Sequence, residues 1–172
     1  MTIKQVFQAA LNEWEWEDEI EYDESDDTDI VKTSYSIDEK RYSFVMWSDE
    51  RRQWISISVK SPLSIPDARR ADGALLLNYF NSGMSIGKFT MGMNDGYVYY
   101  SNTIDIEGTE AVPMLFSNMR IAAASAFGEQ RFSAIAAVAY TKQKLKSIID
   151  EFAQALNAPS EDKSDESQFK VE

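Results

Sequence analysis

The fold is decided by residues 41–59, which read RYSFVMWSDERRQWISISV. Two runs in which apolar and polar side chains alternate flank a short charged stretch, a pattern typical of an antiparallel hairpin. We predict a four-residue loop at 49–52, which is a common hairpin length. The apolar side chains then share one face and pair as Met46 with Ile55, Phe44 with Ile57 and Tyr42 with Val59.

The same register places two tryptophans on the other face of this hairpin. Trp47 is expected directly opposite Trp54, among valine and serine side chains. Cross-strand aromatic pairs of this kind stabilise a sheet and carry apolar surface. The pair can serve as a docking site, or a neighbouring helix or a second subunit can cover it, and the second arrangement is the more common one.

A second hairpin is predicted around Asp95-Gly96, a strong signal for a two-residue turn. Alternation again separates two faces. The side chains expected on the apolar face pair as Met93 with Val98, Met91 with Tyr100 and Phe89 with Asn102, and Tyr97 and Tyr99 are expected on the outward face.

Helical periodicity appears before, between and after the strands. Apolar residues from Ile3 to Trp14 recur at helical spacing, a helix is predicted from about Ser64 to Gly83, and two more close the chain. The first of these two is expected from about Thr109 to Gly128 and the second to about Leu156. Strands grouped between helices without strict alternation predict an α+β fold, an antiparallel sheet with helices on one face, in the order α-β-β-β(-β)-α-β-β-α-α.

Residues 14–29, WEWEDEIEYDESDDTD, contain no basic side chain. Alternation predicts a strand with Trp14, Trp16, Ile20 and Tyr22 towards the core and a row of carboxylates in water, followed by a turn from about Glu24. A calcium loop is disfavoured, because Thr28 and Ser34 stand where an EF-hand needs Gly and a bidentate Glu. A catalytic carboxylate pair is disfavoured because acids along one strand face share one environment. The structural role, keeping an aromatic strand soluble, is favoured.

Composition restricts the chemistry that the chain can perform. The 172 residues include neither His nor Cys, which excludes catalytic triads, cysteine nucleophiles and the usual zinc sites. The net charge of −12 argues against nucleic acid and anionic membranes as partners. We expect no cofactor and no metal. The amino terminus lacks the pattern of a signal peptide and no apolar run is long enough to span a membrane, so a cytoplasmic protein is expected.

The chain is predicted to form one domain over residues 1–156, followed by an acidic tail over 157–172. The tail, rich in Ser, Asp and Glu, lacks the apolar side chains that a packed core requires.

The order of elements, together with residues 75–108, resembles the YbjN family. The resemblance rests on Asn78 and Asn81, on Gly87–Phe89, on Asp95–Tyr100, and on Glu107 with Gly108. Members are described as bacterial sensory transduction regulators and share the fold of type III secretion chaperones. The resemblance implies a non-enzymatic module, often dimeric, that binds segments of other proteins and has no catalytic residues.

The expected function is therefore that of a protein-binding module, chaperone-like or regulatory, that holds a partner polypeptide segment on its sheet. The candidate binding residues are Trp47, Trp54, Tyr97 and Tyr99. Two alternatives remain. One is a divalent-cation-dependent enzyme that uses carboxylates, and the other is a structural subunit, such as a homodimer, whose aromatic face is consumed in self-association.

Overall fold

The structure is a computed structural model and describes residues 1–37 and 39–157. Its centre is a six-stranded antiparallel sheet in the order β1-β2-β3-β4-β6-β5. The strands are β1 (Glu21–Asp23), β2 (Thr28–Ile37), β3 (Lys40–Asp49), β4 (Trp54–Ser64), β5 (Lys88–Met91) and β6 (Tyr97–Asp105). The helices are α1 (Ile3–Glu13), α2 (Arg70–Ser82), α3 (Pro113–Ala126), α4 (Glu129–Tyr140) and α5 (Leu145–Asn157), with a 3-10 turn η1 (Asp67–Arg69) before α2. The predicted α+β class and order of elements are confirmed.

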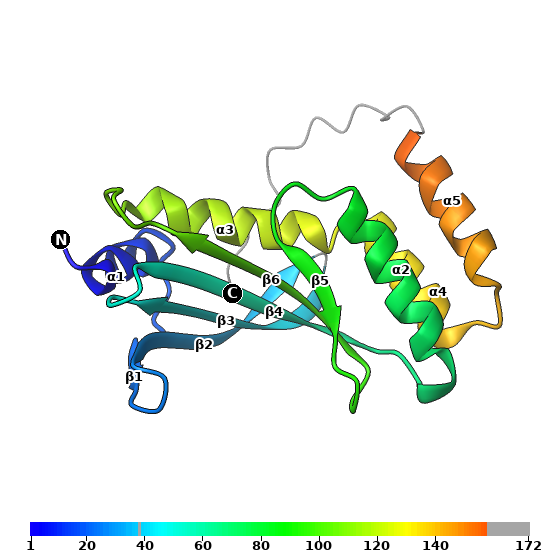
Figure 1. The fold of residues 1–172 in the computed structure, drawn as a ribbon, viewed down its shortest axis with the longest axis horizontal. Helices are drawn as coiled ribbons and strands as arrows, with labels where there is room; N and C mark the ends of the chain where they lie inside the picture. The colour runs from blue at the N-terminus through cyan, green and yellow to red at the C-terminus, as the bar shows by residue number, and fades with distance from the viewer. Residues whose placement is uncertain (38, 158–172) are drawn as a thin grey trace.

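The helices of the described part of the chain leave one face of the sheet uncovered. Figure 1 shows α1 and α3 lying over one face and α2, α4 and α5 gathered at one end of the same layer. Helices α1, α3 and α4 contact strands β3, β4 and β6 from this side. We call the opposite, uncovered side the open face.

The helix-covered face holds the core, as the alternation in residues 41–59 predicts. Tyr42, Phe44, Met46, Ile55, Ile57 and Val59 are all at most 2% exposed. The predicted pairing is nevertheless wrong by two residues, because Met46 pairs with Ile57 and the loop occupies 50–53. The Asp49 carboxylate accepts a 2.7 Å hydrogen bond from the Arg52 backbone N–H, and Gln53 adopts a positive φ of 56°. This side-chain cap places the loop one residue later than predicted.

The second hairpin is shifted in the same way. Met91 pairs with Val98 and Phe89 with Tyr100, so the two-residue turn at Asp95-Gly96 is wrong. The Gly92 N–H donates to the Tyr97 carbonyl at 2.9 Å and the Gly96 N–H to the Gly92 carbonyl at 2.8 Å, which closes a longer loop. Met93, expected on the apolar face, lies in this loop and is 69% exposed.

The acidic segment does not form the long strand that its alternation predicts. Trp14 caps the C-terminus of α1 and Glu15 takes a positive φ of 57°, which turns the chain away from the helix axis. Only Glu21–Asp23 is strand. Trp14 is buried at 7% exposure, whereas Tyr22, expected in the core, is 57% exposed because it lies on this short edge strand.

Two helices begin later than the sequence predicts. Strand β4 runs on to Ser64 through a bulge that accommodates Pro62, so α2 begins only at Arg70. Helix α3 begins at Pro113, a residue favoured in the first turn because its missing N–H needs no partner there.

The predicted last helix is divided into α4 and α5. The Arg69 guanidinium donates to the carbonyls of Thr141, at 2.7 Å, and Gln143, at 2.9 Å, which holds the intervening linker in a non-helical path. Helix α5 packs back through Phe152, whose ring centroid lies 4.8 Å from that of Phe80 in α2. Of the tail predicted for 157–172, all but Asn157 lies outside the described residues.

Candidate protein-binding surface

The open face is built from the outward side chains of five strands. The strand register sets them side by side in rows, from β5 across β6, β4 and β3 to β2. Its members are Ile30, Lys32, Ser34, Ser36, Arg41, Ser43, Val45, Trp47, Asp49, Trp54, Ser56, Ser58, Lys60, Lys88, Thr90, Tyr97, Tyr99, Ser101, Thr103 and Asp105.

Both candidate tryptophans lie on this face, but not opposite each other. Trp47 pairs with Ile30 on one side and Ser56 on the other, whereas Trp54 pairs with Asp49 and Asp105. The predicted direct Trp47–Trp54 pair is therefore wrong, because the two-residue shift of the hairpin moves each tryptophan to a different partner. Trp47 is half-buried, and Trp54 is 41% exposed.

The candidate tyrosines lie at the other end of the open face. The Lys60 ammonium is 3.6 Å from the ring centroid of Tyr97 and 6.0 Å from that of Tyr99, a cation–π arrangement. Asp95 fixes the start of this strand, because its carboxylate accepts the Tyr97 N–H at 3.1 Å. Trp54 begins β4 and Tyr97 pairs with its last residue. Trp54 and Tyr97 are thus separated by roughly 30 Å of strand, whereas Trp47 and Tyr99, whose partners in β4 are Ser56 and Lys60, are separated by roughly 13 Å.

Small hydroxyl side chains, of which Ser56 is itself buried, lie among the aromatic residues of the open face. Ser56 and Thr103 are cross-strand neighbours whose side-chain oxygens lie 2.8 Å apart, and Ser58 pairs with Ser101 in the next outward row. Side chains of this size leave the backbone of β4 and β6 close to the surface. The candidate residues therefore border a polar floor.

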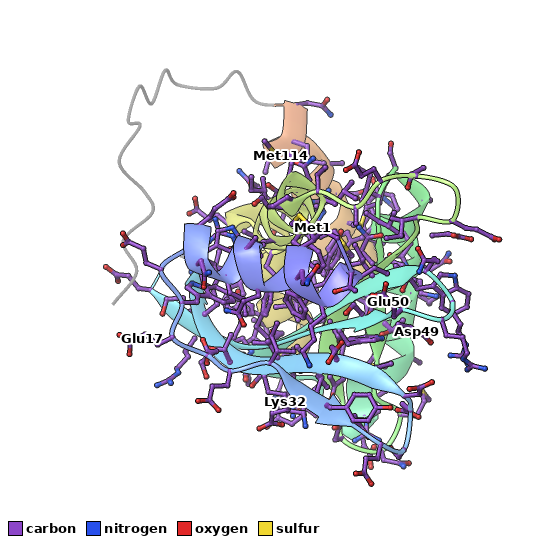
Figure 2. All side chains as sticks on the ribbon, turned by 90° about the vertical axis from the view of Figure 1, so that its left-hand side faces the viewer. Met1, Glu17, Lys32, Asp49, Glu50 and Met114 are labelled. Carbon is purple, nitrogen blue, oxygen red and sulfur yellow. The ribbon has the colours of Figure 1, made fainter. Side chains whose placement is uncertain are left out.

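Four basic residues on the open face were missed in the sequence analysis. Lys32, Arg41, Lys60 and Lys88 stand on the open-face side of β2, β3, β4 and β5. Figure 2 shows Lys32 projecting below the sheet, on the side away from α1. The parity that identified the aromatics could have found them, since each occupies the alternate position of its strand that carries outward residues.

A shallow hollow opens among the basic residues of β2 and β3. Its volume is about 470 Å³. It is lined by Asp18, Lys32, Thr33, Ser34, Arg41, Ser43, Phe44 and Val45.

Several carboxylates of the acidic segment are engaged in local contacts. Asp23 accepts the Ser25 N–H and hydroxyl at 3.0 and 2.7 Å, and these hydrogen bonds lower the pKa of its carboxyl. Asp27 accepts the Tyr22 hydroxyl at 2.6 Å, which raises the pKa of that phenol. Asp29 pairs with Lys4 at 2.7 Å. Within residues 1–37 and 39–157, no group of three or more acidic side chains could hold a metal ion.

Comparison with known families adds to this geometry. The profile of the YbjN family, described as "Putative bacterial sensory transduction regulator", matches residues 5–119. The chain belongs to the YbjN family. The match runs from α1 into α3 and includes all the strands of the described sheet, and hence the whole open face. No curated protein matches the chain. Among the described residues of this YbjN protein, no helix is long and apolar enough to cross a membrane.

The residues that carry the YbjN resemblance serve the fold more than the open face. Gly87 adopts a φ of +67°, and a Cβ there would lie 2.3 Å from the Tyr100 hydroxyl oxygen. Gly96 has a φ of +71°, and a Cβ there would lie 2.1 Å from the Ile65 carbonyl oxygen. Both positions need glycine for conformation and for space. Of the residues that carry the resemblance, Lys88, Tyr97 and Tyr99 are on the open face.

Proposed function

We propose that the protein is a non-enzymatic regulatory module that binds a segment of a partner protein on the open face of its sheet. The observation that carries the proposal is the open face itself, where Trp47, Trp54, Tyr97 and Tyr99 lie on the side without helices. Aromatic side chains supply large contact area at small entropic cost, which is why they are enriched in binding surfaces. The family description as a regulator supports a protein partner.

The role is chaperone-like in one respect. A sheet face bounded by aromatic ends suits an extended polypeptide, which can place apolar side chains on the tryptophans and on the tyrosines while crossing the serine-rich floor. If the protein instead uses the same aromatic side chains for self-association, it forms a homodimer in which this face is buried. The two modes compete for the same residues, so the same variants test both.

The test compares the capture of partner proteins by three chains. These are the native chain, the Trp47→Ser/Trp54→Ser double variant and the Tyr97→Ser/Tyr99→Ser double variant. Loss of capture by either pair, with an unchanged thermal midpoint, is the expected result. Tyr140→Ser is the matched control, because Tyr140 is 67% exposed on α4, away from the sheet. If the aromatic variants melt early and still capture the same proteins, these side chains stabilise the fold and the proposal is wrong.

Sedimentation of the native chain and the same variants separates the two modes. A dimer that becomes monomeric in the Trp47→Ser/Trp54→Ser variant would assign the face to self-association. A compact monomer in both would leave the face available to a partner.

A further inference from the structure

We infer that the partner segment is acidic and extended, and that it binds across a basic band formed by Lys32, Arg41, Lys60 and Lys88. The inference rests on the proposed function and names the chemistry of the partner. It begins from the placement of charge in a strongly acidic chain, which carries 29 Asp and Glu against 17 Lys and Arg. Against that excess of acid, four strands of the open face each carry one of these basic side chains.

The strand register shows how the band is assembled. One outward row runs Lys88, Ser101, Ser58, Val45, Lys32, and the next runs Thr90, Tyr99, Lys60, Ser43, Ser34. Neither row contains an acidic residue. Beyond the second row, Arg41 of β3 pairs with Ser36 of β2. Lys88 and Lys32 are four strands apart, so the band is roughly 19 Å wide.

These cations are available to an incoming anion. Within the described residues, no acidic side chain forms an ion pair with Arg41 or Lys88, and both are exposed. Lys32 has an ion pair with Glu21 at 3.8 Å, where both side chains are more than half exposed. Such a pair contributes little and exchanges readily for another carboxylate. Lys60 is held over Tyr97, which positions its ammonium at the surface.

Acidic residues border the band at both ends of the face. The exposed Asp105 flanks Trp54 at one end, and Asp95 holds the tyrosine strand at the other. A ligand with uniform negative charge, such as single-stranded nucleic acid, would place phosphates against these carboxylates. A polypeptide can carry acidic side chains over the band and apolar side chains at the aromatic ends. The charge pattern therefore favours a polypeptide and fixes the register in which it binds.

An extended segment matches the spacing of the band. Alternate side chains of a strand point to the same side and are separated by roughly 7 Å. The two rows of the band are likewise two residues apart along β4, at Ser58 and Lys60. A segment that runs along the strands can therefore place acidic residues at alternate positions over successive rows while the intervening side chains face solvent. Exposed ion pairs of this kind are individually weak, so the affinity is expected to depend strongly on salt.

The test selects binders from a displayed library of random twelve-residue peptides on the full-length protein. Enriched peptides are expected to carry more Asp and Glu than the starting library. Their affinity is expected to fall by roughly tenfold in Arg41→Glu/Lys88→Glu and by less in Arg41→Gln/Lys88→Gln, since two screened charge contacts are reversed or removed. Raising the salt concentration to about 0.5 M should weaken the native complex in the same direction.

The matched control is Lys142→Glu/Lys144→Glu, which changes the net charge equally and lies in the exposed linker between α4 and α5. Affinity for the selected peptides should stay within about twofold of the native value in this variant, because salt screens charges that lie more than a Debye length from the bound peptide. An equal loss in both double variants would mean that net charge alone governs binding, and would overturn the inference.

The remaining outcomes separate this inference from the proposed function. Neutral or basic peptides that depend on Trp47 or Tyr99 would overturn the acidic partner and leave the binding face standing. A library without any enriched peptide that depends on the open face would overturn both. A twelve-nucleotide oligouridine that displaces the selected peptides at a lower concentration than the free peptides themselves would assign the band to nucleic acid instead. Displacement by a peptide of residues 158–172 would assign it to the chain's own terminus.

Discussion

The side-chain amide of Asn81 in α2 bonds both backbone groups of Phe89 in β5. Its nitrogen donates to the Phe89 carbonyl at 2.9 Å, and its oxygen accepts the Phe89 N–H at 2.7 Å. Strand β5 is an edge of the sheet. Asn81 therefore takes the place of a neighbouring strand for one residue, which satisfies the edge groups that would otherwise pair with another chain.

Loss of this amide is expected to destabilise the fold. We expect Asn81→Ala to lower the free energy of unfolding by about 1–3 kcal/mol, because two part-buried backbone groups lose their partner. Asn78→Ala is the control, since Asn78 lies one turn earlier in α2 and is exposed. Its change should stay within about 0.5 kcal/mol. Urea denaturation measures both, and equal effects would contradict the role given to Asn81.

A second glycine, Gly108, separates the steric effect of a side chain at Gly87 on Tyr100 from the effect of backbone strain. Gly108 has a φ of +73° and no atom within 4 Å of a Cβ built on it, whereas a Cβ on Gly87 meets the Tyr100 ring. Gly108→Ala is expected to cost about 1 kcal/mol from backbone strain alone. Gly87→Ala should cost about 1–3 kcal/mol more, because the buried ring cannot move aside. Similar thermal midpoints for the two variants would show that the contact is unimportant.

Arg120 joins α3 to the aromatic segment that follows α1. Its guanidinium carbon lies 4.7 Å from the ring centroid of Trp14 and 5.9 Å from those of Trp16 and Tyr35. Arg120→Met keeps the aliphatic stem and removes the cation, and we expect a loss of about 1 kcal/mol in the free energy of unfolding.

The matched control for Arg120 is Arg51→Met. Arg51 is 68% exposed and has a 3.8 Å ion pair with Asp27, so its replacement should change stability by less than about 0.5 kcal/mol. Chemical denaturation followed by tryptophan fluorescence reports both changes. An Arg120→Met variant as stable as Arg51→Met would remove the cation–π contribution from this account.

Alkaline pH should destabilise the protein through Tyr100. Burial raises the pKa of this phenol above its ordinary value of 10.0, with an opposing effect from Arg131. A pKa raised by folding means that the protonated phenol favours the folded state. The corresponding stability is complete below pH 10 and is lost as pH rises through the folded pKa.

Replacement of Tyr100 tests this dependence. Between pH 9 and pH 11, the free energy of unfolding of the native chain should fall more steeply than that of Tyr100→Phe, which cannot ionise. The pKa of Tyr22 is also raised, by its hydrogen bond to Asp27, but Tyr22 is present in both proteins and its contribution cancels. Parallel pH profiles in urea melts would exclude Tyr100 as the group responsible.

Alternation of side chains predicted the faces of both hairpins correctly but not their registers. Each observed pairing is shifted by two residues, and a shift of two returns every side chain to the same face. The core residues were therefore identified while the direct Trp47–Trp54 pair was not. The register depends on the Asp49 carboxylate and on the loop closed by Gly92, interactions that a periodicity of two does not contain.

Positive φ angles at ordinary residues caused the largest error in the fold prediction. Glu15 turns the chain after α1 with a φ of 57°, and no residue preference marks a glutamate for that conformation. The acidic and aromatic residues after it alternate as they would in a strand, although only Glu21–Asp23 forms one. Tertiary contacts, among them the packing of Trp16 against Phe44 at 5.4 Å, hold the segment instead.

The candidate site was predicted only in part, because alternation specifies the face on which a side chain lies and not its neighbours on other strands. Parity placed Trp47, Trp54, Tyr97 and Tyr99 on one side of the sheet, and the structure places them there. Their separation along β4 and the alignment of Lys88 with Lys32 across the strands depend on pairing between segments far apart in sequence. Those distances follow from the sheet order, which no local pattern specifies.

The position of α4 and α5 also bears on how such a protein can diversify. Both follow the part of the chain that the family profile covers, and α5 rests on α2 through Phe152 rather than beneath the strands. Additions at the carboxyl end thus thicken one layer and leave the opposite one untouched. Lengthening, trimming or exchanging these helices would then alter the helix layer without altering the open face, because the two lie on opposite sides of a single sheet.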